Sequence, residues 1–349
     1  MTFFTDKWVI GRIDQQDLVL VRKFKRNIFL EWISQYEKDN REVLTTEVLE
    51  EYDVALGPQD NIYILYQNIE GHLILNVIND KEKKEICLTQ KGLSEVFNLG
   101  LEVQDKFIHI LYTIKANDNK YLIYHHFYDG NIWKDFIVDE IKIKKVINPM
   151  KSIVEDEKLI LVYYTDDYSI VLKDFNTKEL QWSDSTQLVE GENEKLFLDA
   201  LIVDGSIHLS FCQYIDGNLI ASYIRFDQRD GIYEKTMEKF ISNEGGPSHP
   251  SIIYYKNELW IVWLELDKLF SRSSKDNGLS WGPIYMWNET KKIDFIRYKY
   301  ASTIKDEKIH FDYSFGSIYP EIKFLGFGPT NKAVEIPIKK KTQMKFYSP

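Results

Sequence analysis

The stretch Leu159-Ile-Leu-Val-Tyr163 is one copy of a five-residue pattern (apolar, variable, apolar, variable, aromatic) that recurs along the chain. The other copies are Ile28-Phe-Leu-Glu-Trp32, Ile62-Tyr-Ile-Leu-Tyr66, Ile108-His-Ile-Leu-Tyr112, Ile207-His-Leu-Ser-Phe211, Leu259-Trp-Ile-Val-Trp263 and Ile309-His-Phe-Asp-Tyr313. Their closing aromatic residues are separated by 34, 46, 51, 48, 52 and 50 residues. Seven copies at close to fifty residues account for the whole chain, so the sequence reads as one repeat architecture.

Each copy has the same surroundings. A strand and a turn such as Asp204-Gly205 precede it, and a turn such as Asp216-Gly-Asn218 follows it. A third strand and a weaker fourth strand complete the unit. Asp, Asn and Gly supply the conformations that tight hairpins need. Four antiparallel strands per fifty residues, without a long helical period, predict an all-β fold, a β-propeller of four-stranded blades.

The number of blades depends on the first unit, which is short. Between Trp32 and Tyr52 there is room for one further strand, roughly residues 43–49, so this unit is expected to mark the ring closure. The run Ala333-Val-Glu-Ile-Pro-Ile338 is a candidate for the missing strand. We predict seven blades, with six as the alternative if the first unit is only a closing piece. The propeller is assigned to residues 1–328, and residues 329–349 to a closing strand, a basic tail or a linker.

Composition excludes several classes of function. The 349 residues include 44 Lys and Arg against 54 Asp and Glu, a net charge of −10, and no basic stripe, which argues against nucleic acid as partner. No apolar segment approaches the length of a membrane helix, and no signal peptide is seen, so a cytoplasmic location is expected. One position of the repeat unit holds His109, His208 and His310 in three units and unrelated large side chains in the others. This variation favours a packing role over a metal site. No metal or other cofactor is predicted.

One motif is specific to a family. Ser274-Lys-Asp276-Asn-Gly278-Leu-Ser280-Trp281 matches the Asp-box, Ser-x-Asp-x-Gly-x-Thr/Ser-Trp. In this respect the chain resembles the sialidase-like, or BNR-repeat, β-propellers. The motif is a hairpin turn in which Asp276 caps backbone N–H groups, Gly278 takes a left-handed conformation and Trp281 packs into the blade. The resemblance implies a structural role for Ser274, Asp276, Gly278 and Trp281.

The resemblance does not extend to sialidase chemistry. A working sialidase of this family is expected to carry an Arg-Ile-Pro segment and three arginines that converge on the substrate carboxylate. Here Arg12-Ile13 is followed by Asp14, not by proline. The chain holds eight arginines in all, and Arg297 is one of those that could converge on a site. Because lysine does not replace the guanidinium fork, sialidase activity is not expected. We assign no catalytic residues.

Two hypotheses remain. The first is a non-catalytic recognition propeller whose loop face binds a carbohydrate or a protein partner, with rim positions chosen by register. These positions are Tyr36, Tyr52, Asn98, Asn148, Tyr168, Tyr214 and His249. The second is a glycoside hydrolase or lyase of sialidase-like fold, which requires two facing carboxylates; Asp53, Asp199 and Glu265 are the candidates. Two carboxylates and a basic residue in one axial pocket would distinguish the second hypothesis from a flat, aromatic binding face.

Overall fold

The computed structural model describes residues 8–13, 18–33, 40–79, 82–117, 120–142, 149–155, 158–304, 308–319 and 321–339. These residues form β-strands joined by tight turns and three short 3-10 helices, η1 (Pro58–Asp60), η2 (Asn288–Lys291) and η3 (Thr330–Lys332). No helix within these ranges is long and apolar enough to cross a membrane. The chain is therefore built almost entirely from sheets, as the fifty-residue repeat predicts.

Four sheets are antiparallel meanders in which the strands follow chain order, except that β17 of the third sheet pairs with β15. The first contains β5 (Val48–Leu56), β6 (Ile62–Asn68), β7 (Leu73–Ile78) and β8 (Lys83–Cys87). The second contains β9 (Val96–Gln104), β10 (Phe107–Asn117), β11 (Lys120–Tyr128) and β12 (Trp133–Lys142). The third contains β13 (Met150–Glu155), β14 (Lys158–Tyr164), β15 (Ile170–Asn176), β16 (Gln181–Trp182) and β17 (Thr186–Val189). The fourth contains β18 (Lys195–Val203), β19 (Ser206–Ile215), β20 (Asn218–Arg229) and β21 (Ile232–Phe240).

The last two sheets include segments from distant parts of the chain. The fifth is ordered β27 (Ile309–His310), β22 (Ser248–Tyr255), β23 (Glu258–Glu265), β24 (Lys268–Ser274), β25 (Ile284–Trp287) and β30 (Ala333–Ile336). The sixth is ordered β29 (Lys323–Leu325), β28 (Tyr313–Ser317), β26 (Ile296–Ser302), β1 (Trp8–Arg12), β2 (Leu18–Phe24), β3 (Asn27–Ile33) and β4 (Asn40–Thr45).

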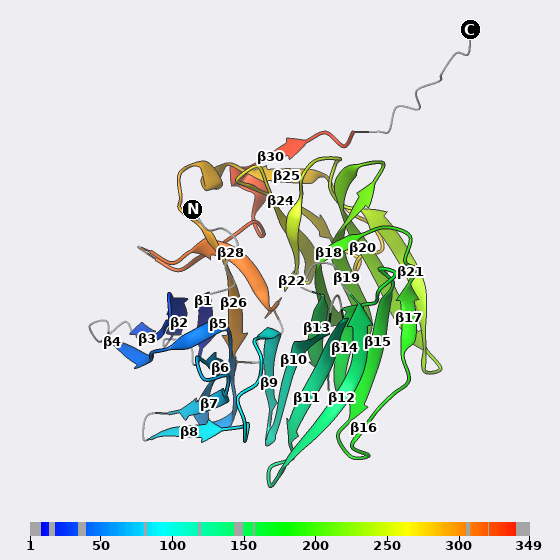
Figure 1. Cartoon of the computed structure of the whole chain (residues 1–349). Helices are drawn as coiled ribbons and strands as arrows, with labels where there is room; N and C mark the ends of the chain where they lie inside the picture. Colours follow the sequence, from blue (N-terminus) through cyan, green and yellow to red (C-terminus); the bar gives the residue numbers. More distant parts are fainter. Residues whose placement is uncertain are drawn as a thin grey trace.

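The six sheets are arranged around a common axis like the blades of a propeller (Figure 1). One strand from each sheet lies innermost: β5, β9, β13, β18, β22 and β26. Each of these strands packs beside the innermost part of a neighbouring sheet, and β28 makes the contact between the fifth and sixth sheets. A single sheet cannot cover its own faces, so each apolar face is buried by the next blade.

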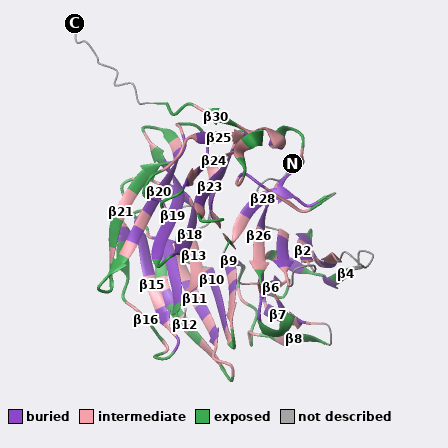
Figure 2. Cartoon of the chain, turned by 180° about the vertical axis from the view of Figure 1, so that it is seen from behind, coloured by how far each residue is buried: buried purple, intermediate pink, exposed green. Residues whose placement is uncertain are grey.

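Burial falls from the middle of each blade to its outer edge (Figure 2). In β23 the six residues 259–264 are all buried, whereas most residues of the outermost strand β21 are exposed. Strands covered on both faces by neighbouring blades read as continuous apolar runs. This is why the repeated five-residue pattern, which lies in the second strand of most blades, is the clearest signal in the sequence.

The described residues form six sheets, not the seven that the count of repeat copies predicts. The first and last units share one sheet, because β1 pairs with β26 in parallel register, with Val9 opposite Lys299. The last copy of the pattern, Ile309 to Tyr313, is divided between β27, which pairs with β22, and β28, which pairs with β26. The short first unit therefore closes the ring, as expected, and the six-bladed alternative describes the molecule.

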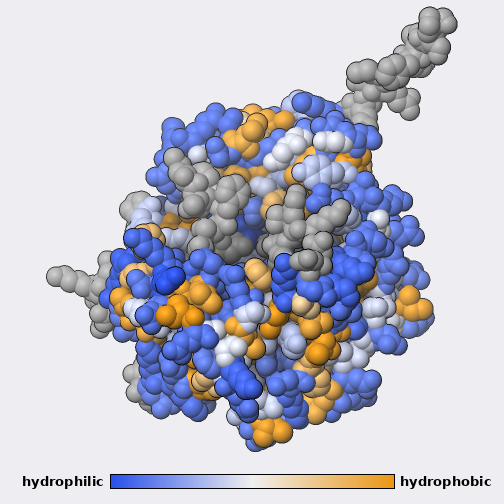
Figure 3. Space-filling model, in the orientation of Figure 1, coloured by the Kyte–Doolittle hydropathy of each residue, from blue (hydrophilic) through white to orange (hydrophobic). Residues whose placement is uncertain are grey.

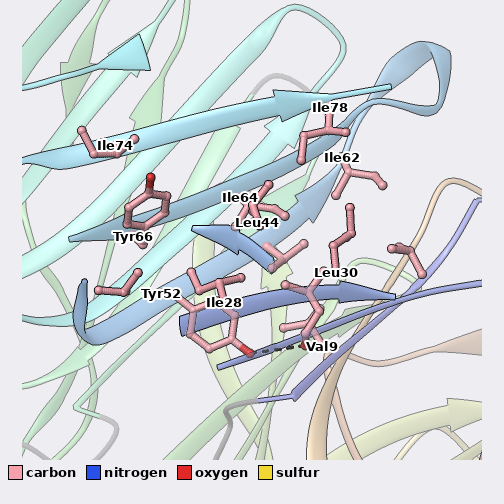
Figure 4. Packing of buried hydrophobic residues seen from close by; sticks show 14 of the residues in the cluster. Val9, Ile28, Leu30, Leu44, Tyr52, Ile62, Ile64, Tyr66, Ile74 and Ile78 are labelled. Atoms are coloured by element: carbon pink, nitrogen blue, oxygen red, sulfur yellow. Dashed lines mark hydrogen bonds between the residues drawn. The ribbon is translucent and has the colours of Figure 1, made fainter. Parts of the chain in front are cut away.

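The C-terminal strand does not complete the first unit. β30 pairs with β25 on the outer edge of the fifth sheet, where Ala333 lies opposite Trp287. The first unit has its own fourth strand, β4, so the position predicted for the C-terminal run is already filled. Figure 4 shows how the closing unit packs: Ile28 and Leu30 of β3 lie against Ile64 of β6, within one apolar cluster shared by the sixth and first sheets.

Candidate functional site

Three inner strands carry the same irregularity near their N-terminal ends. In β9, β18 and β22 two consecutive residues lie opposite a single residue of the next strand, which is the signature of a β-bulge. The first bulged residues are Asn98, Phe197 and His249, with φ values of 54°, 58° and 50°. Left-handed backbone is costly for residues other than glycine, above all for a bulky side chain such as phenylalanine. Bulges and strained residues of this kind are concentrated at binding and catalytic sites.

The bulges lie opposite the closing aromatic residues of the repeated pattern. By register, these are Tyr112, Phe211 and Trp263. The Phe197 and His249 rings are 4.2 Å apart, so neighbouring bulges contact each other across the blade boundary. The strand register read from the sequence predicted Asn98 and His249 as rim residues. It did not predict Phe197, which occupies the equivalent bulge position in its own repeat unit. A comparison of equivalent positions in the repeat units could have found it.

An axial cavity of about 270 Å³ opens at this end of the inner strands. It is lined by Glu50, Glu51, Tyr52, Asp53, Asn98, Leu99, Gly100, Glu102, Leu111, Met150, Lys151, Ser152, Leu161, Leu198, Lys299 and Tyr313. We call it cavity 1. It brings together three residues predicted from the sequence, Tyr52, Asp53 and Asn98, with three further carboxyl groups, Glu50, Glu51 and Glu102, and two lysines.

The lysines of cavity 1 are held by carboxylates. Lys299 Nζ lies 2.8 Å from Oδ1 and 2.7 Å from Oδ2 of Asp53, and Asp53 Oδ2 also accepts the backbone N–H of Leu101 at 2.8 Å. Lys151 forms an ion pair with Asp312. Burial disfavours both ammonium groups, but the neighbouring carboxylates offset it and raise the pKa of each lysine. Both lysines are therefore positively charged at neutral pH.

Glu102 differs from the other carboxyl groups of the site. Its Oε1 accepts the hydroxyl of Ser152 at 2.8 Å. Burial raises the pKa of Glu102 to about 7, although Lys299 and Lys151 oppose the shift. The side chain is only partly buried because cavities touch it from both sides along the axis. Glu102 is thus the carboxyl group whose charge changes near neutral pH.

Asp199 and Arg297 lie beside cavity 1 in the next blades and have structural partners. Asp199 Oδ2 accepts the backbone N–H of Ile252 at 2.8 Å, repeating the tie between inner strands that Asp53 makes to Leu101. Burial raises the pKa of Asp199, and Lys151 opposes the shift. The Arg297 guanidinium lies 3.9 Å from the centre of the Tyr313 ring. These two residues stabilise the packing of blades around the cavity.

Asn98 has an unused hydrogen-bonding atom. Its Oδ1 is buried and has no hydrogen-bond partner among the described residues, and the residue lines cavity 1. Burying a carbonyl oxygen without a partner costs about 1–3 kcal/mol. A residue with strained backbone and an unsatisfied acceptor is therefore among those that line cavity 1.

The remaining predicted rim residues do not line cavity 1. Tyr168 lies in the turn after β14 and its carbonyl accepts Lys195 Nζ, while Tyr214 of β19 is 38% exposed. Glu265, at the end of β23, accepts the Trp263 indole N–H at 3.4 Å and lies against Gly245. Sequence spacing gives the position of a residue along the repeat, but it cannot give its distance from the axis. Tyr36 and Asn148 lie outside the described residues.

The Asp-box forms the turn between β24 and β25, on the outer part of the fifth blade. Asp276 Oδ1 accepts the hydroxyl of Ser274 at 2.7 Å and the backbone N–H of Ser280 at 2.8 Å. Gly278 has φ of 86°, and the Trp281 ring packs edge-on against Tyr223 at 4.7 Å. The hydrogen bonds of Asp276 therefore stay within the turn, whereas Trp281 packs against Tyr223 of β20 in the neighbouring blade.

Two of the three recurring histidines, His109 and His208, are packing residues within blades, whereas His310 is exposed, contrary to the packing role expected for it. His109 Nδ1 lies 3.1 Å from His125 Nε2, and burial lowers the pKa of His109 to about 4. His208 bonds to the Tyr223 hydroxyl at 2.7 Å, and burial lowers its pKa to about 3. In the described part of the chain, no three His, Cys, Asp or Glu side chains are grouped as a metal site would require.

Comparisons with known proteins identify the fold and no sequence family. No family model and no curated protein matches the sequence. BP39L lectin from Burkholderia pseudomallei is similar in structure, with a TM-score of 0.58 at 9% identity over 84% of this chain and 88% of that one. The six-bladed fucose-binding lectin of Aleuria aurantia matches with a TM-score of 0.47 at 10% identity, over 80% and 96% of the two chains. YjhT matches with a TM-score of 0.44 at 11% identity, over 83% and 98%.

The chain is therefore a β-propeller whose structural likeness is to a lectin propeller. The sialidase-like assignment receives no support from these comparisons. The hydrogen bonds of the Asp-box hairpin lie within residues 274–280, so this local turn does not by itself assign the chain to a family.

Proposed function

We propose that the protein is a non-catalytic recognition propeller that binds a neutral sugar residue in cavity 1. The observation that carries the proposal is the strained bulge at Asn98, a residue that lines cavity 1 and has a buried Oδ1 without a hydrogen-bond partner among the described residues. The volume of about 270 Å³ lies just below the range of about 300–1,000 Å³ typical of drug-sized ligands, so it suits one sugar ring.

The lining chemistry supports a hydroxyl-rich ligand. The lining combines polar side chains such as Asn98 and Ser152 with Leu99, Leu198 and Tyr313, which provide apolar surface for the C–H face of a sugar. Lys299 and Lys151 are already paired with Asp53 and Asp312, which argues against an anionic sugar. The fold of BP39L shows that a propeller of this shape can belong to a lectin, although fold alone does not assign a ligand.

A sugar is favoured over a protein partner by the surface. The face in Figure 3 is mostly hydrophilic, with hydrophobic residues in small separate groups. Exposed large hydrophobic residues such as Val43, Ile137 and Ile232 belong to different blades. A stable protein interface usually has a contiguous apolar centre, which this arrangement does not offer on the visible face.

The test is a glycan-array screen followed by calorimetry with the wild-type protein and Asn98→Ala. We expect saturable binding that Asn98→Ala weakens by at least tenfold. Asn277→Ala is the matched control, because Asn277 also has left-handed φ and an unpartnered Oδ1 but lies in the Asp-box turn. No glycan binding, or equal affinity of the Asn98→Ala variant, would contradict the proposal and make a protein partner the leading alternative.

Glycoside hydrolysis is the second candidate, favoured by the presence of Asp53 and Glu102 in one cavity with two lysines. Both Asp53 oxygens are engaged by Lys299, and one also accepts Leu101 N–H, so this carboxylate is poorly placed to attack a sugar or a water. Chromogenic glycosides run beside the binding assay decide the matter: turnover that Glu102→Gln abolishes would replace the lectin proposal.

A further inference from the structure

The wall of cavity 1 has a gap at Gly100, in the middle of β9. This residue lies opposite Leu111, one position before the closing aromatic residue of the repeat. The equivalent positions of four other inner strands, found by the same register, all carry polar side chains. They are Asp53 opposite Leu65, Lys151 opposite Val162, Asp199 opposite Ser210 and Ser251 opposite Val262.

The gap at Gly100 is not filled by neighbouring atoms. A Cβ added there would lie 3.9 Å from its nearest neighbours, the Leu111 carbonyl oxygen and the Ser152 hydroxyl oxygen. Gly100 itself lines cavity 1. Glycine inside a strand weakens the strand and often marks a place where a ligand comes close to the backbone. The space over Gly100 is therefore part of cavity 1 and reaches Ser152.

Glu102 lies at the edge of this gap. It follows Gly100 by two residues in β9, so both residues belong to the same face of the strand. Ser152, which borders the gap, donates its hydroxyl to Oε1 of Glu102 at 2.8 Å. Among the described residues Ser152 is the hydrogen-bond partner of this carboxyl group, and Oε2 stays in contact with solvent. Oε2 can therefore accept a hydrogen bond from a ligand.

The other carboxyl groups that line cavity 1 are engaged by the protein. Both oxygens of Asp53 are held by a lysine. Oε2 of Glu50 is paired with a second lysine at 3.2 Å, and Oε2 of Glu51 accepts a backbone N–H at 3.3 Å. Glu102 is therefore the acidic residue of the cavity that is best placed to contact a ligand.

We propose that a hydroxyl group of the bound sugar enters the gap at Gly100 and donates a hydrogen bond to Glu102, which makes Glu102 the specificity-determining residue of cavity 1. This inference rests on the sugar site proposed above. A ligand over Gly100 is flanked along β9 by Asn98 and Glu102, since successive residues of a strand are about 3.3 Å apart. A hydrogen bond to an ionised carboxylate is about twice as strong as one between neutral groups, so the charge on Glu102 controls the affinity.

Sugar affinity should therefore increase with pH. Burial raises the pKa of Glu102 to about 7, so this carboxyl group is mostly protonated at pH 5.5 and mostly ionised at pH 8.5. His109, opposite Glu102 in β10, has its pKa lowered to about 4 by burial and stays neutral across this range. The charged groups that act on Glu102 are Lys299 of β26, Lys151 of β13 and Asp312, and, through these, Asp53, Asp199 and His310.

The experiment is calorimetry of the full chain with the methyl α-glycosides of glucose, mannose, galactose and fucose at pH 5.5 and pH 8.5. For the tightest ligand we expect the wild-type protein to bind at least fivefold more tightly at pH 8.5. Glu102→Gln should bind at least tenfold more weakly than wild type at pH 8.5, with equal affinity at both pH values. Glu265→Gln is the matched control, because burial also raises the pKa of Glu265 but this residue does not line cavity 1.

Gly100→Val tests the gap itself. The added side chain should occupy the space beside Ser152 and weaken binding at least tenfold at both pH values. Gly246→Val, at a loop position with open space around it, is the matched control. Thermal unfolding of each variant ensures that lost binding is not lost folding.

Two results would overturn this inference and leave the sugar site in place. One is a wild-type affinity that is equal at pH 5.5 and pH 8.5. The other is unchanged affinity in both Glu102→Gln and Gly100→Val while Asn98→Ala binds weakly. A lack of binding of all four glycosides to the wild-type protein would overturn both this inference and the sugar site.

Discussion

Lys299 and Asp53 are 246 residues apart in the chain, yet the ammonium of one lies within 2.8 Å of both carboxylate oxygens of the other. Asp53 belongs to the first blade and Lys299 to the inner strand of the sixth, so the pair joins the two blades where the ring closes. Asp53 also accepts the N–H of Leu101 in the second blade. One carboxylate therefore holds three inner strands together.

Breaking this ion pair should destabilise the protein strongly. Lys299→Met leaves the Asp53 carboxylate charged and nearly buried, so we expect a loss of about 3–5 kcal/mol in the free energy of unfolding. Urea unfolding measures the loss. The double variant Lys299→Met with Asp53→Leu should recover part of it, because no unpaired charge remains. A loss below about 1 kcal/mol in the single variant would mean that the pair does not hold the ring closed.

Glu102 should make stability depend on pH in the opposite sense to a paired carboxylate. Folding raises its pKa from the ordinary value of 4.5 to about 7. The contribution of Glu102 to the free energy of unfolding is therefore complete below pH 4.5 and is lost as the pH rises through 7. Glu102→Gln should therefore be more stable than wild type at pH 8.5, by about 1 kcal/mol, because the cavities on both sides moderate the cost of charge. Urea unfolding at pH 5 and pH 8.5 tests this, with the exposed Glu140→Gln as control. A gain of equal size at both pH values would refute the assignment to ionisation.

The buried pair His109 and His125 should make the protein sensitive to acid. Burial lowers the pKa of His109 from 6.5 to about 4 and that of His125 well below 6.5. As the pH falls, the two histidines are protonated in the unfolded chain before they are protonated in the folded one. The contribution of the neutral histidines to the free energy of unfolding is therefore complete above pH 6.5 and falls as the pH drops toward 4. For His109 the loss at pH 4 is about 2–3 kcal/mol.

The double variant His109→Leu with His125→Leu tests this origin of acid sensitivity. Its thermal midpoint should fall less than that of the wild type between pH 7 and pH 4.5. His310→Leu, at an exposed position, is the matched control. If the double variant follows the wild-type pH profile, other groups cause the acid sensitivity.

Gly278 of the Asp-box should tolerate no side chain. Its φ is 86°, and an added Cβ would lie 1.8 Å from the Tyr223 hydroxyl. Gly231 has a similar φ of 80° with open space around it, so Gly231→Ala reports backbone strain alone, about 1 kcal/mol. Gly278→Ala should cost at least about 2 kcal/mol more than Gly231→Ala in chemical unfolding. Equal costs would show that the Tyr223 contact can move aside freely.

Leu266 occupies a turn position that suits asparagine better than leucine. It has φ of 48°, is 84% exposed, and is followed by Asp267 with φ of 58°, so both central residues of the hairpin turn are left-handed. Leu266→Asn should stabilise the protein by about 0.5–1 kcal/mol, because asparagine adopts this conformation at lower cost. Leu279→Asn, also exposed, is the control and should stay within about 0.5 kcal/mol of wild type. No gain at Leu266 would mean that the turn is not strained.

Only part of the candidate site could be predicted from the sequence. Register predicted Asn98 and His249 at equivalent heights of the inner strands; both are bulge residues, but of the two only Asn98 lines cavity 1. Phe197 was missed because nothing in its side chain marks a bulge. Tyr168, Tyr214 and Glu265 were expected at the site but lie away from cavity 1, since register gives height along the axis and not distance from it.

The sequence by itself determined the propeller, its repeating strand pairs and the Asp-box hairpin, because these depend on alternation and turn chemistry within about fifty residues. Only the tertiary structure decided that six sheets form and that the first unit joins β26. It also decided which charges meet at the axis, where Glu102 lies between two cavities. Those contacts join residues up to 246 positions apart. They form only when the ring closes and brings distant strands together, and no local sequence pattern encodes this.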